Sequence, residues 1–105
     1  MNNQEFHLLP EKNFTTWAKR FEMLADPTRL RLLSYIHLNP ASPVQDLAKA
    51  AGVTQTAASQ ALRTLRENGW VKAERDGRLM RYELTDDSAH QILHFMGHDH
   101  NYPHE

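Results

Sequence analysis

Several features that define other protein classes are missing from this chain. Cysteine is absent from its 105 residues, which excludes disulfides, thiolate metal sites and thiol redox chemistry. No apolar run approaches the roughly 18 residues that span a bilayer, and the polar start Met1 to Phe6 lacks a signal-peptide pattern. Any chemistry must therefore use imidazoles, carboxylates or hydroxyls, and we expect a cytoplasmic protein.

The chain is also too short for two domains, because one domain typically takes about 100 to 150 residues. Its 40% apolar and 24% charged residues are the composition of a globular protein rather than a disordered one. We therefore predict a single domain over residues 1–105.

The net charge of −1 conceals an uneven distribution of charge along the sequence. Residues 54–81 carry six Lys or Arg and three Asp or Glu, whereas residues 82–105 carry no Lys or Arg and five Asp or Glu. The second segment also holds five of the seven histidines. A basic middle suits nucleic acid, and a tail of imidazoles and carboxylates suits metal ions.

Apolar spacing predicts four helices in the first two thirds of the chain. They cover about residues 12–25, 27–38, 43–51 and 55–68. Asp26 is expected to cap the second helix, and Ser42 is expected to cap the third in a capping box with Gln45. Gly52 ends the third helix and Thr54 caps the fourth, so a turn of about four residues joins them. This arrangement is typical of a helix-turn-helix.

Two strands and a last helix complete the prediction. Alternating β-forming residues indicate strands over Trp70–Glu74 and Leu79–Leu84, and Asp76-Gly77 between them signals a hairpin with a type I′ turn. A helix is expected over about residues 87–96. The predicted fold class is mainly α with a small β-hairpin, in the order α-α-α-α-β-β-α. A helix-turn-helix followed by a basic hairpin is a winged helix-turn-helix.

The fourth predicted helix has two different faces. Ala58, Ala61, Leu62 and Leu65 form an apolar inner face, which leaves amides, hydroxyls and Arg outside. Such side chains can read base edges in the major groove of DNA, and Arg on a hairpin can contact phosphates or the minor groove. The predicted DNA-binding residues are Gln55, Thr56, Ser59, Gln60 and Arg63 on the helix, with Arg75, Arg78 and Arg81 on the hairpin. Taken by itself, the polar face is also compatible with a merely solvated helix.

The sequence resembles the ArsR/SmtB family of bacterial winged-helix repressors over about residues 15–96. The resemblance rests on the segments MLADPTRLRLL (23–33), VQDLA (44–48), VTQTAASQAL (53–62) and RDGR (75–78). It implies a homodimer, built from the first and last helices, that binds a palindromic double-stranded DNA operator and is released by an inducer. The family pattern often has His where this chain has Ala61.

The metal-ligand pattern of the family is only partly present. Members that sense zinc, cobalt or nickel often carry Asp-x-His, ten further residues, and then His-x-x-His or His-x-x-Glu on the last helix. In this chain Ser88 stands where the first His would be, and Asp99 stands at the downstream position. The family's ligand set therefore does not transfer directly.

The spacing of the tail nevertheless favours a metal site. On an ideal helix Asp87, His90, His94 and His98 fall within about 80° of one another. If two last helices pair antiparallel in the register that the resemblance implies, His90 faces His98 of the partner subunit and Asp87 lies near His100 of the partner subunit. We therefore predict that Asp87, His90, His98 and His100 bind Zn²⁺, Ni²⁺ or Co²⁺.

Other interpretations stay open at this stage. The tail histidines are compatible with a solvated surface, and a repressor of this kind can have a non-metal inducer or none. Gly97-His98-Asp99-His100 partly resembles the metal-binding run of some hydrolases, but the chain lacks the length for that fold, so we predict no enzyme. His37 ends an apolar helix and is expected to be a packing or capping residue.

Overall fold

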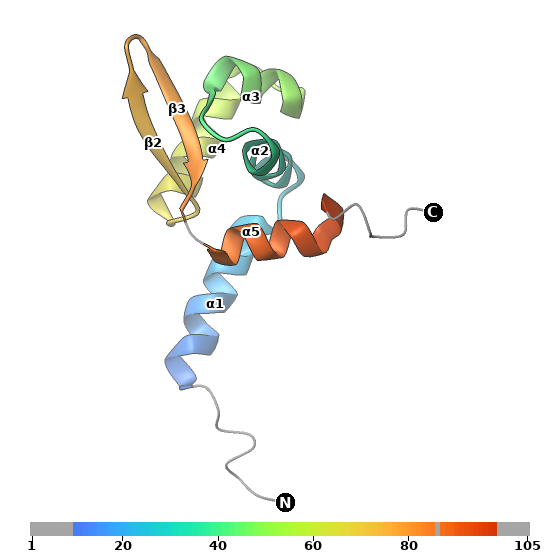
Figure 1. Cartoon of the computed structure of the whole chain (residues 1–105). Helices are drawn as coiled ribbons and strands as arrows, with labels where there is room; N and C mark the ends of the chain where they lie inside the picture. The colour runs from blue at the N-terminus through green and yellow to red at the C-terminus, as the bar shows by residue number, and fades with distance from the viewer. Residues whose placement is uncertain (1–9, 86, 99–105) are drawn as a thin grey trace, which may run out of the picture.

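The computed structural model describes residues 10–85 and 87–98 of the chain. In chain order the elements are α1 (Glu11–Leu24), α2 (Pro27–Leu38), β1 (Ser42–Pro43), α3 (Val44–Ala51), α4 (Gln55–Glu67), β2 (Val71–Asp76), β3 (Leu79–Leu84), α5 (Asp87–Leu93) and the π-helical turn η2 (His94–His98). Figure 1 shows α2, α3 and α4 grouped beside the β2–β3 hairpin, while α1 extends away from them. The last helix, α5, lies next to the C-terminal end of α1. Within the described residues, none of these helices is both long and apolar enough to cross a membrane.

Local capping signals start two of the helices where the sequence predicts them. The Asp26 carboxylate accepts a hydrogen bond from the Arg29 amide at 2.9 Å, and the Thr54 hydroxyl accepts one from the Ala57 amide at 3.1 Å. Each bond satisfies an amide of the first helical turn that has no partner within the helix. Gly52 adopts a left-handed conformation with φ 71° at the end of α3. The helix-turn-helix over α3 and α4 is thereby confirmed.

The predicted capping box at Ser42 is wrong. Ser42 belongs to β1, where it pairs with Tyr82 of β3, and its hydroxyl donates to the Asn39 carbonyl oxygen at 2.5 Å. Pro43 precedes the first residue of α3, and no side chain caps that helix. The short strand β1 adds a third member to the sheet, in the order β1-β3-β2.

The hairpin is confirmed, but its turn differs from the predicted type I′ turn. Asp76 pairs with Leu79, so β2 continues two residues further than predicted, β3 has its predicted bounds, and the loop consists of Gly77 and Arg78. Gly77 has φ 65°, and neither Asp76 nor Arg78 is among the described residues with positive φ. A positive φ at the first loop residue alone is the pattern of a type II′ turn, which favours glycine there.

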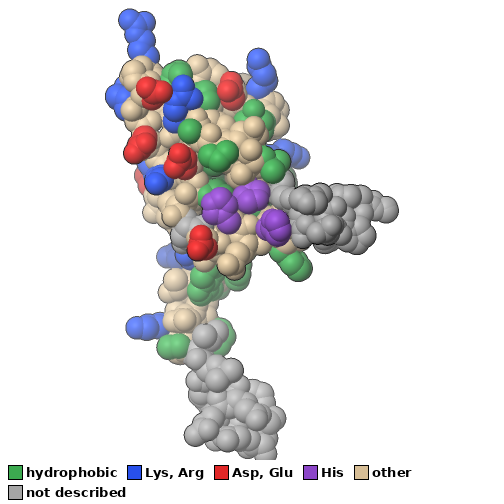
Figure 2. Space-filling view, viewed as in Figure 1, with side chains coloured by type: hydrophobic (Ala, Val, Ile, Leu, Met, Phe, Trp, Pro, Cys, Tyr) green, Lys and Arg blue, Asp and Glu red, His purple; other side chains and the backbone are tan. Residues whose placement is uncertain are grey.

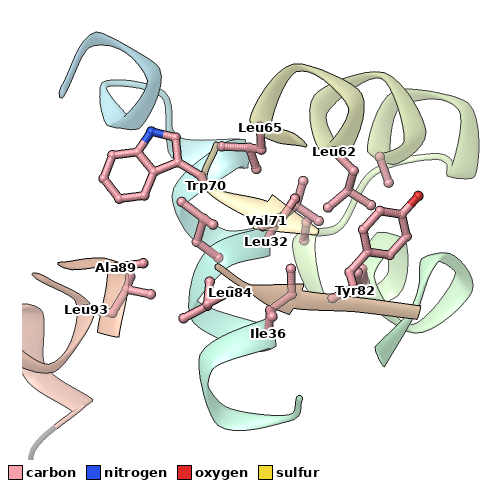
Figure 3. Close-up of a cluster of buried hydrophobic side chains, with 14 of the residues drawn as sticks. Leu32, Ile36, Leu62, Leu65, Trp70, Val71, Tyr82, Leu84, Ala89 and Leu93 are labelled. Atoms are coloured by element: carbon pink, nitrogen blue, oxygen red, sulfur yellow. The ribbon is translucent and has the colours of Figure 1, made fainter. Parts of the chain in front are cut away.

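The hydrophobic core lies where α2, α3 and α4 meet the sheet. Trp70, just before β2, and Val71, its first residue, are almost completely buried, together with leucines of all three helices. Figure 3 shows Trp70, Leu65 and Leu62 along one side of this cluster, with Ala89 and Leu93 of α5 at its edge. Burial of Ala89 and Leu93 attaches α5 to the core that α2, α3 and α4 form with the sheet.

The last helix is shorter than the sequence predicts. Regular α-helix ends at Leu93, and Gly97 in the following π-helical turn has φ 123°, outside the helical range. The prediction of regular helix to Met96 is therefore wrong. The ideal-helix geometry that aligned Asp87 with His90 and His94 does not extend to His98.

Candidate nucleic-acid interface

The exposed face of α4 carries the residues that the sequence predicts for base contact. Ala58, Leu62 and Leu65 are buried against the core, which orients the rest of the helix. The exposed side chains of this face are Gln55, Thr56, Ser59, Gln60 and Arg63. The division into a buried and a polar face is confirmed, while contact of these five side chains with DNA remains a prediction.

Arg63 has a partner on its own helix. Its Nε lies 3.3 Å from Oε2 of Glu67, one helical turn along, and both side chains are largely exposed. An exposed pair of this kind contributes about 0 to 1 kcal/mol, so it is easily exchanged for another partner. A DNA phosphate would therefore compete readily with Glu67 for the guanidinium.

The tip of the β2–β3 hairpin presents two arginines to solvent. Arg75 is the second-last residue of β2 and pairs with Met80, and Arg78 is in the turn. Both side chains are exposed. This placement suits contact with phosphates beside the groove that α4 would enter.

Arg81 differs from the other two hairpin arginines. Its Nε donates to Oδ2 of Asp76 at 2.8 Å, and its Nη1 donates to the carbonyl oxygen of Ala41 at 3.0 Å. Its side chain is 35% exposed. Arg81 therefore ties the hairpin to the segment before β1, a structural role that the sequence does not predict, and its contact with DNA remains a prediction.

A second surface, exposed and apolar, lies between α1 and α5. Within α1, all of which the structure describes, no residue is buried, and Phe14 and Phe21 are each 52% exposed. Phe95, after α5, is 80% exposed. With Trp17 and Ile92 these rings line a groove of about 720 Å³ between α1 and α5. Continuous apolar surface of this kind marks an interaction site.

Arg20 holds α1 against the body of the protein. Its guanidinium carbon lies 4.7 Å from the ring centre of Trp17 and 4.3 Å from that of Trp70. A cation over an aromatic face is attracted by the electron density of the ring. The two contacts fix how α1 leaves the core, and hence the direction in which its apolar face points.

The predicted metal residues fall on the tail side of the molecule. Asp87 and His90 are exposed on α5, whereas the side chain of His98 is not described and His100 lies outside the described residues. In the part of the chain that the structure covers, no group of three or more His, Asp or Glu converges on one point. The predicted set of Asp87, His90, His98 and His100 therefore remains a prediction.

His90 has a neighbour that the sequence does not predict. Its Nδ1 lies 3.1 Å from Nδ1 of His37, and the two ring centres are 5.1 Å apart with 59° between the ring planes. Figure 2 shows histidine side chains gathered on this face of the molecule. His37 belongs to the last turn of α2. Through His90 it contacts α5, a contact beyond the packing or capping role that the sequence predicts for it. No local sequence signal links two residues 53 positions apart.

A polar helix backed by a helix-turn-helix core, beside a hairpin tipped with arginine, defines a winged helix-turn-helix DNA-binding protein. The model of the MarR family matches residues 26–79, just over half of the chain. The chain therefore belongs to this family of winged helix-turn-helix regulators. This assignment places it among transcriptional regulators rather than enzymes.

Individual relatives agree with this class. A transcriptional repressor SmtB homolog from Synechocystis is 44% identical over 70 residues, which cover 67% of this chain and 52% of that protein. A CadC homolog from Staphylococcus aureus, a cadmium resistance transcriptional regulatory protein, is 31% identical over 85 residues, which cover 81% and 70%. The chain spans 52% to 62% of the length of three curated relatives, the SmtB homolog among them.

Solved structures show the same fold. A homodimeric winged helix-turn-helix DNA-binding domain from Mycobacterium bovis has a TM-score of 0.72 to this structure at 22% sequence identity. The match covers 100% of this chain and 96% of that one. At this identity the similarity concerns the fold alone.

Proposed function

We propose that this chain is a DNA-binding transcriptional repressor of the ArsR/SmtB type, acting as a homodimer on a palindromic operator in the cytoplasm. The observation that carries the proposal is the exposed face of α4, with Gln55, Ser59 and Gln60 beside Arg63. Amides can bond adenine edges, and hydroxyls can bond several bases. The segments that resemble ArsR/SmtB repressors, and the identity to the SmtB homolog, support the finer assignment.

The α1–α5 groove supports the homodimer. Of its exposed rings, Phe14 and Phe21 lie on α1 and Phe95 lies just after α5, at the first and last helices that form the dimer contact in the resembling family. A second copy of the chain would cover the same rings with its own, as a two-fold interface requires. A dimer also presents two copies of α4, which matches the two half-sites of a palindrome.

A divalent transition metal is the inducer in this proposal. The CadC homolog is named for cadmium resistance, and residues 82–105 combine five histidines with five carboxylates and no Lys or Arg. The ligand set predicted from sequence is Asp87 and His90 with His98 of the partner subunit and His100 of the partner subunit, for Zn²⁺, Ni²⁺ or Co²⁺. A non-metal inducer is the alternative.

The fold suggests how a metal ion could act on DNA binding. α5 contributes to the exposed apolar groove through Ile92, and it contacts the core through Ala89 and Leu93. An ion held on α5 would therefore bias both the dimer contact and the position of the DNA-binding half. By linkage, an ion that favours a dimer geometry unsuited to DNA must itself bind more weakly to the DNA complex.

Operator binding by the metal-free protein tests the first part of the proposal. Palindromic duplexes are selected from a random pool with the full chain, and affinity is measured by fluorescence anisotropy between 50 and 200 mM salt. If the dimer contacts six to ten phosphates, its affinity falls about 10³- to 10⁵-fold over that range. Failure to select any duplex, or a monomer in sedimentation at micromolar concentration, would contradict the proposal.

A further inference from the structure

We infer that His37 and His90 of one protomer form a two-imidazole chelate for a divalent transition-metal ion, joining α2 to α5. The inference names ligands for the metal response in the proposed function and rests on that function only for its regulatory consequence. The ligand that is new is His37. It belongs to α2, and the ligand set predicted from the tail does not contain it.

The separation of the two imidazole nitrogens suits a shared ion. The Nδ1 atoms of His37 and His90 lie 3.1 Å apart. With metal–nitrogen bonds of about 2.0 to 2.1 Å, two ligands of one ion are about 3.3 to 3.4 Å apart in a tetrahedron and about 2.8 to 3.0 Å apart at a right angle in an octahedron. The observed distance falls between these values.

The two imidazoles reach this position from different helices. His37 is half-buried in the last turn of α2, and His90 is exposed on α5. Contacts between α2 and α5 hold the two helices together, so the pair does not depend on one flexible segment. His94 follows one helical turn after His90 and is exposed. Water can occupy the remaining positions, which Ni²⁺ and Co²⁺ accept readily in octahedral sites.

A hydrogen bond between the rings is the competing explanation of the same distance. In that case one Nδ1 carries the proton and the other accepts it. In the chelate neither Nδ1 carries a proton, and both neutral rings hold theirs on Nε2. In the hydrogen-bonded arrangement His37 could still affect metal binding by orienting His90, but only in the chelate does Nδ1 of His37 itself bind the ion.

The position of the His37–His90 pair would let a bound ion influence the helix-turn-helix. α2 packs against both α3 and α4, and it also contacts α5. An ion that joins His37 to His90 would therefore fix α5 relative to the helix-turn-helix within one protomer. The coupling would not require a ligand from the second protomer.

Cobalt titration of the full-length, metal-free protein tests the inference directly. Co²⁺ absorption and calorimetry are followed for the wild type and for His37→Gln, His90→Gln and His94→Gln. Loss of one ligand should weaken Co²⁺ binding by about tenfold or more in the first two variants. His94→Gln serves as the matched control on α5 and should change the affinity less than about threefold. Wild-type affinity in His37→Gln would overturn the inference.

Imidazole nitrogen NMR on the wild-type protein gives a second test that does not depend on the folding of a variant. During a Zn²⁺ titration the ring nitrogens of His37 and His90 should shift together, with an endpoint of one ion per chain. Shifts confined to histidines other than His37 would contradict the chelate. Neither measurement contains DNA, so a protein that binds the ion at this pair but no operator would contradict only the proposed function.

Discussion

Nε of Arg81 lies 2.8 Å from Oδ2 of Asp76, and this contact crosses the hairpin just behind its tip. The same guanidinium also donates to the Ala41 carbonyl, so it braces the hairpin against the segment before β1. Arg75 and Arg78 have no such role in the described structure and are exposed. Arg81 therefore braces the hairpin, whereas the side chains of Arg75 and Arg78 are exposed near its tip.

Replacing Arg78 separates phosphate contact from the brace. Arg78→Ala should weaken binding to operator DNA and to random DNA by a similar factor, because a phosphate contact carries no sequence information. The slope of log affinity against log salt concentration should fall by about one, because one phosphate contact is lost. Arg81→Ala should instead lower the melting temperature of the protein, and Arg78→Ala should not. Anisotropy over a salt series and thermal denaturation measure the two effects. A lower melting temperature in Arg78→Ala, with unchanged stability in Arg81→Ala, would contradict these roles.

Gln60 is the side chain of α4 expected to affect sequence choice most. Gln60→Ala should narrow the free-energy gap between operator and random DNA by about 1 to 3 kcal/mol, since an amide bonded to a base edge is lost. Binding to random DNA should hardly change. Competition anisotropy with both duplexes measures the gap, and an equal loss for both would rule out base contact by this residue.

Arg20 should matter for stability although it lies on an exposed helix. Arg20→Ala removes both ring contacts, and the free energy of unfolding should fall by about 1 to 2 kcal/mol. Lys19→Ala on the same helix is the matched control and should change it by less than about 0.5 kcal/mol. Urea denaturation of both variants provides the values. A difference within error between the two would contradict a role for the Trp17–Arg20–Trp70 stack.

The apolar groove should control assembly. Phe21→Glu places a charge among the exposed rings of α1, so the protein should sediment as a monomer and lose most of its operator affinity. The buried core does not include Phe21, and the monomer should remain folded by circular dichroism. A dimer that persists in Phe21→Glu would show that another surface makes the contact.

Features encoded by neighbouring residues could be predicted from the sequence. The caps at Asp26 and Thr54 depend on amides three residues away, and the two faces of α4 follow from helical periodicity. Features that depend on distant partners could not be predicted. Ser42 joins a strand because Tyr82 pairs with it, and Pro43 rather than Ser42 occupies the position before α3. The hairpin turn likewise depends on how far β2 and β3 pair.

The candidate sites show the same limit. The polar face of α4 and the exposed hairpin arginines follow from local pattern. The structural role of Arg81 depends on its hydrogen bond to the carbonyl oxygen of Ala41, which precedes the helix-turn-helix in the sequence. His37 could be recognised as a neighbour of His90 only once α2 and α5 were packed together. Ideal-helix geometry also fails near Gly97, where the backbone leaves the helical range.

Release of operator DNA by a metal ion tests the proposed repressor most directly. Metal-free wild-type protein is bound to a labelled, selected palindromic duplex, and Zn²⁺, Co²⁺ or Ni²⁺ is added while anisotropy is recorded, with a chelator added at the end. One of these ions should lower the affinity by about 5- to 150-fold, the usual range of coupling between two sites, and the chelator should restore it. His90→Gln should bind the duplex as the wild type does but no longer respond. A wild-type complex unaffected by all three ions would contradict a metal-released repressor.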